Sequence, residues 1–319
     1  MSARWQWATL AVVCAAGALA PQSTTARAAG ETLRSAGEWL IFNDEFDGPR
    51  GAPPDPRRWT TEVGPRGREQ LQYYKDGGNA YLDGRGHLVI EARREPTPGA
   101  HCPDPPMAPT DERLPCRYTS ARLTGFEPFT YGRVEGRIRA ATGYGLLSAF
   151  WLAAATEPGP GEPEARCTEL DVMEHIGRQP RRIYGTVHGP GYCGAAGVSM
   201  YQRLARPASA DFHTYSLKWT PELLEFSVDG VIYHVLSRPE VERRCGPWAF
   251  DQPHVVVVNL IVGGLWGRPP FASARFPRRM FVDYVRVYQG PQELRPPEVR
   301  RPASIGGCLL IPAADRRAS

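Results

Sequence analysis

The sequence predicts an all-β fold, built as a sandwich of antiparallel sheets. Apolar and polar residues alternate with a period of two in several short runs, and no long segment carries a helical stripe. The 319 residues include 33 glycines and 32 prolines, which indicates frequent turns. Many short strands separated by turns are typical of such a sandwich.

The first clear strand covers residues 133–140. Val134 and Ile138 fall on one face, while Arg133 and Glu135 fall on the opposite face. This period of two predicts a strand with one face on the core and the other in water.

A β-hairpin is predicted around the dipeptide Asp229-Gly230, because a two-residue turn of this type joins two alternating runs. The apolar members of the runs are Leu224, Phe226 and Val228 before the turn, and Val231, Tyr233 and Val235 after it. Residues 255–262 form a nearly continuous β-branched run, which predicts a strand buried on both faces. A further strand is expected over residues 281–288.

The formal net charge of +4 does not indicate a nucleic-acid partner. Residues 1–28 contribute +2 and residues 291–319 contribute another +2, so the central region carries no net charge. Nucleic-acid binding usually needs a basic footprint on the folded domain. We therefore expect no nucleic acid among the partners.

The N-terminus is typical of an export signal. Arg4 precedes an apolar run over residues 8–20, which suits a signal peptide and is too short to span a bilayer. The stretch Ala26-Arg27-Ala28 offers a small-residue cleavage site, and a buried core helix is the alternative interpretation. We expect a signal peptide at 1–28, one domain at 29–290 and a Pro/Arg-rich tail at 291–319. The mature protein is then secreted or periplasmic, and no longer attached to a membrane.

The even number of cysteines in an exported chain favours disulfides. Without the signal six remain, namely Cys102, Cys116, Cys167, Cys193, Cys245 and Cys308. Six cysteines allow 15 pairings, and the sequence does not choose among them. We predict one pair, Cys102 with Cys116, because these residues flank a proline-rich loop. A zinc site is the weaker alternative, since no C-x-x-C pair is present.

Three carboxylates dominate the chemistry of the sequence. Glu169 and Asp171 share one face of a strand, whereas Glu174 should point to the opposite face. One bulged residue, at Val172 or Met173, would return Glu174 to the same side. Crowded carboxylates are destabilising, and glycoside hydrolysis gives a reason for them, because a retaining enzyme needs a nucleophile and an acid/base close together. A solvated acidic strand face is the alternative.

Several stretches around the carboxylates match a known family. They are residues 43–48, 71–74, 79–81, 88–93, 118–123, 131–135, 149–152, 184–189, 248–253, 259–264 and 282–288. Together with the E-x-D-x-x-E stretch at 169–174, they make residues 39–289 similar to glycoside hydrolase family 16. The resemblance is strongest to its bacterial laminarinase-like endo-β-1,3-glucanases.

The resemblance implies a β-jelly-roll sandwich of the concanavalin A-like lectin/glucanase type, with a substrate groove along a concave sheet. It implies an endo-acting retaining hydrolase in which Glu169 is the nucleophile, Glu174 the acid/base and Asp171 their helper. The implied partner is a polysaccharide, most closely β-1,3-glucan, and no cofactor is required for catalysis. We expect a monomer.

The resemblance also implies a set of substrate-binding residues. Asn79 and Arg122 match positions that hydrogen-bond sugar on the non-reducing side of the cut. Trp151 and Trp266 suit stacking on sugar rings, and His188 would face the carboxylates. Ordinary core packing is the alternative for any single Trp or His. Glu45 and Asp283 match positions near a structural calcium site, for which oxygen ligands are suitable.

Some positions depart from the family pattern. Leu147-Ser148 stands where Trp-Pro is common, Thr168 replaces a Gly and Gln70 replaces a Glu. The segments 156–167 and 64–68 lack tryptophans often found there. These changes affect the expected substrate more than the reaction, so mixed-linkage β-glucan, a galactan and transglycosylation stay open. A glucan-binding protein without catalysis is the alternative outside the enzymes.

Overall fold

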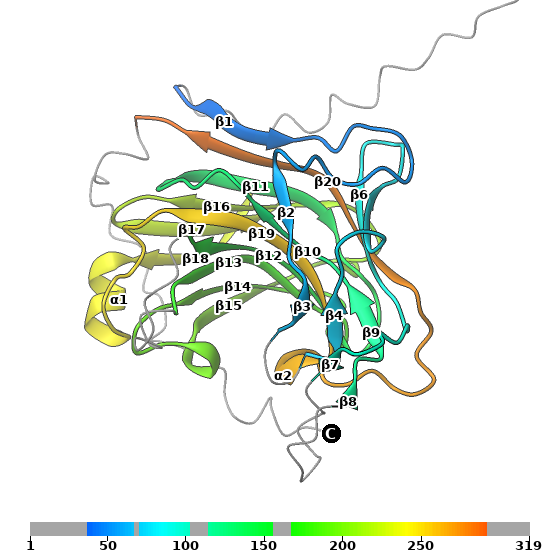
Figure 1. Ribbon diagram of the computed structural model, residues 1–319. Helices are drawn as coiled ribbons and strands as arrows, with labels where there is room; N and C mark the ends of the chain where they lie inside the picture. The colour runs from blue at the N-terminus through cyan, green and yellow to red at the C-terminus, as the bar shows by residue number, and fades with distance from the viewer. Residues whose placement is uncertain (1–36, 67–69, 103–113, 156–166, 292–319) are drawn as a thin grey trace, which may run out of the picture. The chain divides into compact units, whose positions relative to one another are not determined.

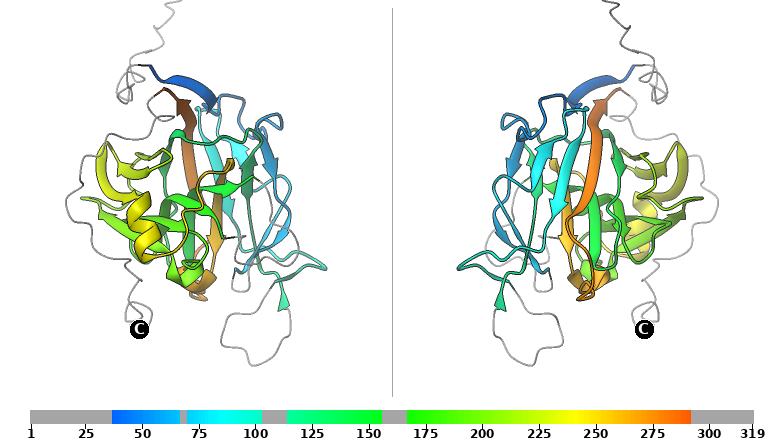
Figure 2. Two further views of the ribbon diagram at one scale, coloured as in Figure 1. Left: turned by 90° about the vertical axis from the view of Figure 1, so that its left-hand side faces the viewer. Right: turned by 90° about the vertical axis from the view of Figure 1, so that its right-hand side faces the viewer.

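The computed structural model describes residues 37–66, 70–102, 114–155 and 167–291, which form two large sheets packed face to face (Figure 1). The eight-stranded sheet contains, in order, β18 (Val231–Ser237), β17 (Leu223–Val228), β16 (His213–Trp219), β11 (Gly132–Arg139), β20 (Arg278–Gln289), β6 (Leu88–Ala92) and β5 (Ala80–Leu82), with β1 (Trp39–Asp44) paired to β20. Figure 2 shows β1 beside the end of β20.

The seven-stranded sheet carries the candidate site. Its strands, in order, are β15 (Val198–Arg203), β14 (Arg182–His188), β13 (Glu169–Ile176), β12 (Leu146–Ala154), β19 (His254–Val262), β10 (Arg122–Gly125) and β2 (Trp59–Thr61). All neighbours in both large sheets pair antiparallel, which confirms the predicted sandwich.

Two smaller sheets and three short helical segments complete the described residues. The small sheets are β3 (Gly64–Pro65) with β4 (Gln72–Tyr74) and β9 (Tyr118–Ser120), and β7 (His101–Cys102) with β8 (Leu114–Pro115). The helical segments are the 3₁₀ turn η2 (Gly194–Ala196), α1 (Arg238–Arg244) and α2 (Gly264–Gly267). Neither α-helix has the length or the apolarity that crossing a bilayer requires.

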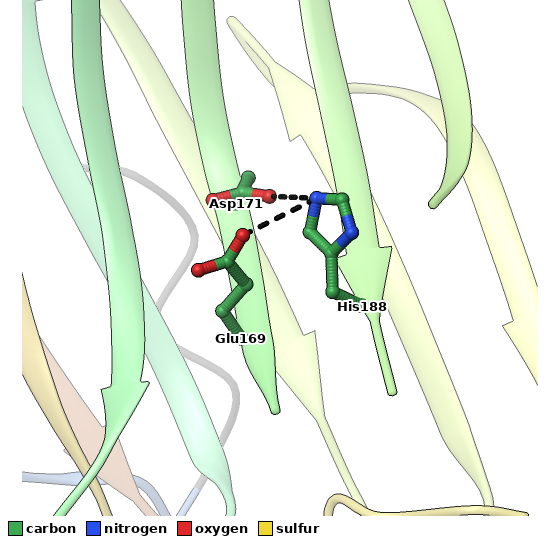
Figure 3. A group of neighbouring side chains, drawn as sticks. All are labelled: Glu169, Asp171 and His188. Atoms are coloured by element: carbon green, nitrogen blue, oxygen red, sulfur yellow. Dashed lines mark ion pairs between the residues drawn. The ribbon is translucent and has the colours of Figure 1, made fainter. Parts of the chain in front are cut away.

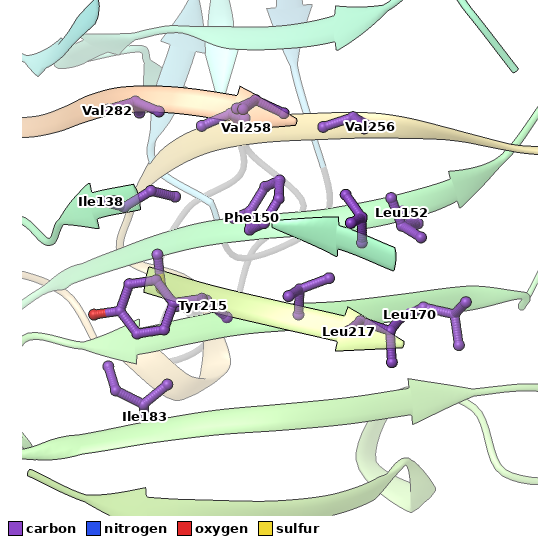
Figure 4. Packing of buried hydrophobic residues seen from close by; sticks show 14 of the residues in the cluster. Ile138, Phe150, Leu152, Leu170, Ile183, Tyr215, Leu217, Val256, Val258 and Val282 are labelled. Carbon is purple, nitrogen blue, oxygen red and sulfur yellow. The ribbon is translucent and has the colours of Figure 1, made fainter. Parts of the chain in front are cut away.

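The core fills the space between the two large sheets (Figure 4). Phe150 and Leu170 come from the seven-stranded sheet, and Ile138 and Leu217 face them from the eight-stranded sheet. All four side chains are fully buried. Burial of such apolar surface stabilises the sandwich and leaves the outer face of each sheet for other tasks.

The hairpin predicted at Asp229-Gly230 is present between β17 and β18. Both turn residues have positive φ, 50° at Asp229 and 78° at Gly230, as a type I′ turn requires. The inward face of β18 differs from the prediction, because a register shift follows Phe226 on β17. His234 and Leu236 are buried, whereas Val231 is exposed.

The outer face of β11 is less exposed to solvent than the sequence predicts. Glu135 is fully buried and forms an ion pair with Arg133, which also contacts Glu38. The guanidinium of Arg133 lies 4.1 Å from the ring centroid of Tyr288. Residues of β20 and of the chain before β1 therefore bury the Arg133–Glu135 pair, which the alternation predicted to face solvent. By contrast, β19 is buried on both faces along most of its length, as predicted.

The disulfide predicted between Cys102 and Cys116 is present. A second bridge joins Cys167 to Cys193, and Cys245 is disulfide-bonded as well. Cys308 lies outside the described residues, as do the predicted signal peptide at 1–28 and nearly all of the predicted tail at 291–319.

Candidate active site

A β-bulge in β13 decides where the carboxylates point. On the β14 side, Asp171 pairs with Thr186 but Glu174 pairs with Tyr184, so β13 carries one extra residue over this interval. The same extra residue appears against β12. Val172 and Met173 both turn into the core, and Glu174 returns to the face of Glu169 and Asp171. The bulge predicted from the spacing is confirmed.

His188 on β14 lies against two of the three carboxylates (Figure 3). Its Nε2 is 3.3 Å from Oε1 of Glu169 and 3.4 Å from Oδ2 of Asp171. The side chain of Glu169 is 37% exposed, whereas that of Asp171 is 8% exposed. Glu169 is therefore open to a ligand, whereas Asp171 is almost completely covered.

The electrostatics of this cluster raise the pKa of the imidazole and of both glutamates, so each of these groups tends to keep its proton. Burial and the charge of Asp171 raise the pKa of Glu169 to about 7, and the same causes raise the pKa of Glu174 well above its usual range. Burial alone would lower the pKa of His188, but Asp171, Glu169 and Glu174 outweigh it and raise that pKa to about 9. At neutral pH the His188 imidazolium thus offsets part of the carboxylate charge.

A pair of hydroxyl groups fixes one oxygen of Glu174. Thr186 Oγ1 donates to Oε2 of Glu174 over 2.9 Å, and Ser199 Oγ lies 3.0 Å from the same hydroxyl. This bond favours the ionised form and opposes the effect of burial on the pKa of Glu174. It also leaves the other carboxyl oxygen of Glu174 as the one available to a ligand.

A groove of about 610 Å³ opens over these residues, on the face of the seven-stranded sheet turned away from the core. Its lining includes Glu169, Glu174, Tyr184, Thr186, His188, Gln70, Leu147, Arg178 and Trp266. The Trp266 ring packs on Tyr184 with centroids 4.9 Å apart. The groove thus combines acidic groups with aromatic faces, which is the composition that sugar binding needs.

Arg122 and Trp151 lie beside the groove and form a cation–π contact. The Arg122 guanidinium is 4.7 Å from the Trp151 ring centroid, and Arg122 Nε donates to Glu62 over 2.7 Å. Trp151 Nε1 donates to Asn259 over 2.8 Å. Arg122 therefore covers the Trp151 ring, which does not line the groove.

Asn79, which the resemblance places among the sugar-binding residues, lies inside the protein. The residue is fully buried, and its Nδ2 donates to the Glu91 carbonyl and to Thr119 Oγ1. Through Nδ2, Asn79 ties the chain near β5 to β6 and β9, while its Oδ1 is buried without a hydrogen-bond partner among the described residues. The residue is not part of the groove lining.

Glu45 and Asp283, expected near a calcium site, each pair with an arginine. Glu45 accepts two bonds from Arg286, at 2.8 and 2.9 Å, and Asp283 accepts from Arg137 at 2.5 Å. Among the described residues, neither belongs to a cluster of three or more side-chain metal ligands. Calcium binding at these residues stays a prediction of the resemblance.

We expect removal of divalent metal to leave turnover unchanged. Glu169, Asp171 and His188 lie close enough to hold an ion, but an ion would have to displace the proton that the raised pKa of His188 keeps on the imidazole near neutral pH. Activity and melting temperature measured after dialysis against EDTA, and again after adding calcium, check this. A loss of activity that calcium restores would contradict it, whereas a change in melting temperature alone would report a structural ion.

Sequence reasoning missed several residues of the site. Tyr184 and Thr186 share the face of His188 because they precede it by four and two positions on β14, so the period of two could have found them. Glu62, which orients Arg122, gives no comparable signal, since β2 and β10 meet only in the folded chain.

A jelly-roll sandwich with clustered carboxylates in a groove of one sheet defines the class of protein, a glycoside hydrolase. Residues 69–285 match the model of Glycosyl hydrolases family 16, and the chain belongs to this family.

Individual relatives agree. A Rhodothermus marinus protein named β-glucanase is 37% identical over 263 residues, and the match covers 78% of this chain and 85% of that protein. A glucan endo-1,3-β-glucosidase of Cryptopygus antarcticus is 33% identical, covering 79% and 93%. The catalytic domain of a Thermotoga petrophila RKU-1 laminarinase superposes with a TM-score of 0.69 at 36% identity, covering 80% and 98%.

Proposed function

We propose that this protein is an endo-acting β-1,3-glucanase that cleaves by double displacement with retention of configuration. The observation that carries the proposal is the β13 bulge, which sets Glu169, Asp171 and Glu174 on one face of the groove. The substrate follows from the relatives, which are named as β-glucanase, glucan endo-1,3-β-glucosidase and laminarinase.

In the proposed mechanism Glu169 attacks the anomeric carbon while Glu174 donates its proton to the leaving oxygen. The raised pKa of Glu174 supports its role as an acid that is still protonated near neutral pH. Glu169 must be ionised to attack, and His188 favours that form. Glu174 then accepts a proton from water, which releases the sugar from Glu169. Asp171 orients His188 and separates the proton affinities of the two glutamates.

The proposal extends to the setting of the enzyme. We propose an exported, monomeric enzyme without a cofactor. The disulfides and the signal-like N-terminus support export. The reaction supports the absence of a cofactor, because two carboxyl groups supply the nucleophile and the proton.

Product analysis tests the proposal against its alternatives. Laminarin, mixed-linkage β-glucan and galactans are each incubated with the enzyme, and released reducing ends, product sizes and anomeric configuration are followed. We expect β-configured oligosaccharides from laminarin first. Cleavage of another polysaccharide alone would overturn the substrate, inverted products would overturn the mechanism, and binding without cleavage would favour a glucan-binding protein.

Replacing Leu147 with tryptophan should strengthen glucan binding more than it raises turnover. Leu147 lines the groove and packs beside Tyr184 and Trp266, where an indole would add a face for a sugar ring. We expect KM for laminarin to fall by about three- to tenfold with kcat nearly unchanged. Initial rates over a range of laminarin concentrations measure both, with Leu147→Met as the control of similar volume. A change confined to kcat would contradict the prediction.

A further inference from the structure

One row of side chains crosses the seven-stranded sheet at right angles to its strands. Glu174 on β13 pairs with Tyr184 on β14, and Tyr184 pairs with Tyr201 on β15. In the other direction, Glu174 pairs with Ala149 and Ala149 with Asn259. Directly paired residues point to the same face of a sheet, so the whole row lies on the face of the groove.

Tyr201 lies at the outer end of this row and is unusually open. It is 45% exposed, whereas Tyr184 beside it is 6% exposed. The two ring centroids are 5.7 Å apart, and Tyr184 in turn contacts Trp266 in the groove. A chain of aromatic ring contacts therefore runs from the groove to the edge strand β15, where the Tyr201 ring is exposed.

The Tyr201 ring is held in place from one side. The guanidinium of Arg182 lies 4.6 Å from its centroid, which is a cation–π distance. A ring fixed in this way loses little conformational freedom when a ligand covers its exposed surface. This is the arrangement that stacking on a sugar ring requires.

The spacing matches a polysaccharide. Neighbouring strands are about 4.8 Å apart, so Tyr201 lies about 10 Å from the strand of Glu174 along the row. That distance is close to two sugar rings. Arg122 lies on the opposite side of Glu174 in the same row, where it pairs with Asn259.

We propose that Tyr201 forms a distal sugar-binding subsite, which stacks on a ring of the glucan chain on the leaving-group side of the cut. The inference rests on the proposed function, in which Glu174 protonates the leaving oxygen, and its side follows the expectation that Arg122 binds sugar on the non-reducing side. The subsite binds long chains, and the leaving group of a short substrate does not reach it.

Tyr201→Ala tests the subsite on two substrates. With laminarin we expect KM to rise by about three- to tenfold, and with an aryl β-laminaribioside we expect no change, because its aryl leaving group ends before Tyr201. Tyr201→Phe keeps the ring and should remain within about twofold of wild type. Phe126→Ala removes another exposed aromatic, 51% exposed and outside the groove lining, and should change neither substrate.

Two outcomes would overturn the subsite. One is an unchanged KM for laminarin in Tyr201→Ala, and the other is an equal loss on both substrates, which would show a structural role for the ring. If the wild-type enzyme prefers another polysaccharide, the proposed substrate fails. The same comparison of long and short chains of that polysaccharide then decides the subsite separately.

Discussion

Replacing Glu174 with alanine is expected to slow cleavage of laminarin by about 10²–10⁴-fold, while an activated aryl glycoside still glycosylates the enzyme. The reason is that the leaving oxygen of a glucan needs a proton, whereas a good aryl leaving group does not. Stopped-flow release of the aryl group, compared with steady-state laminarin cleavage, measures the two effects.

Added azide separates the two glutamates. In Glu174→Ala, azide should attack the glycosyl-enzyme held on Glu169 and give a β-configured product with retained stereochemistry. In Glu169→Ala no such intermediate forms, so azide should attack the substrate directly and give the inverted α product. Proton NMR of the product distinguishes these outcomes.

Asp171→Asn should be the mildest of the three substitutions, because this side chain is only 8% exposed and is expected to orient and tune its neighbours, without forming or breaking a bond in the reaction. Near-normal laminarin cleavage by Glu174→Ala would contradict the assignment of the acid. A retained azide product from Glu169→Ala would contradict the assignment of the nucleophile.

Replacing His188 with glutamine is expected to move the acidic limb of the kcat/KM profile to higher pH. The imidazolium lowers the pKa of both glutamates, so its removal leaves Glu169 protonated over a wider range. If the pKa of Glu169 rises by about one, activity at a pH below the limb falls about tenfold, because the ionised fraction falls by that factor. Rates with an aryl glycoside between pH 4 and 9 measure the limb.

Stability offers a second readout of the same variant. Because the pKa of His188 rises from 6.5 to about 9 on folding, its stabilising contribution is fully present below pH 6.5 and is lost as the pH rises to 9. We expect the melting temperature of the wild type to fall over this window. His188→Gln removes this contribution, whereas the fall that comes from the raised pKa values of Glu169 and Glu174 remains in both proteins.

Gly197→Ala should have a weaker effect in the same direction. A Cβ at this position would lie 2.3 Å from Cε1 of His188, so the ring must move out of its place against Glu169 and Asp171. Gly125→Ala, on the same sheet with an ordinary 3.6 Å contact, is the matched control and should leave the profile unchanged. An acidic limb that stays in place in both His188→Gln and Gly197→Ala would show that the imidazolium does not tune Glu169.

Local sequence determined several elements of the fold. Alternation over residues 133–140, the Asp-Gly turn and the β-branched run at 255–262 each predict an element that the structure contains, because strand and turn formation depend on neighbouring residues. The spacing of Glu169, Asp171 and Glu174 also required a bulge if all three were to share a face, and the bulge is present.

Tertiary structure decided which side chains meet. Asn79 matches a binding position in sequence, yet packing between β6 and β9 buries it. Glu62 reaches Arg122 only because β2 and β10 pair, and Glu135 is buried only because residues from β20 and from the chain before β1 cover β11. Register across strands likewise places Tyr201 in line with Glu174. Such contacts join residues far apart in the chain, so the pattern of neighbouring residues does not predict them. The two faces of each strand, by contrast, follow from the alternation of its residues with a period of two.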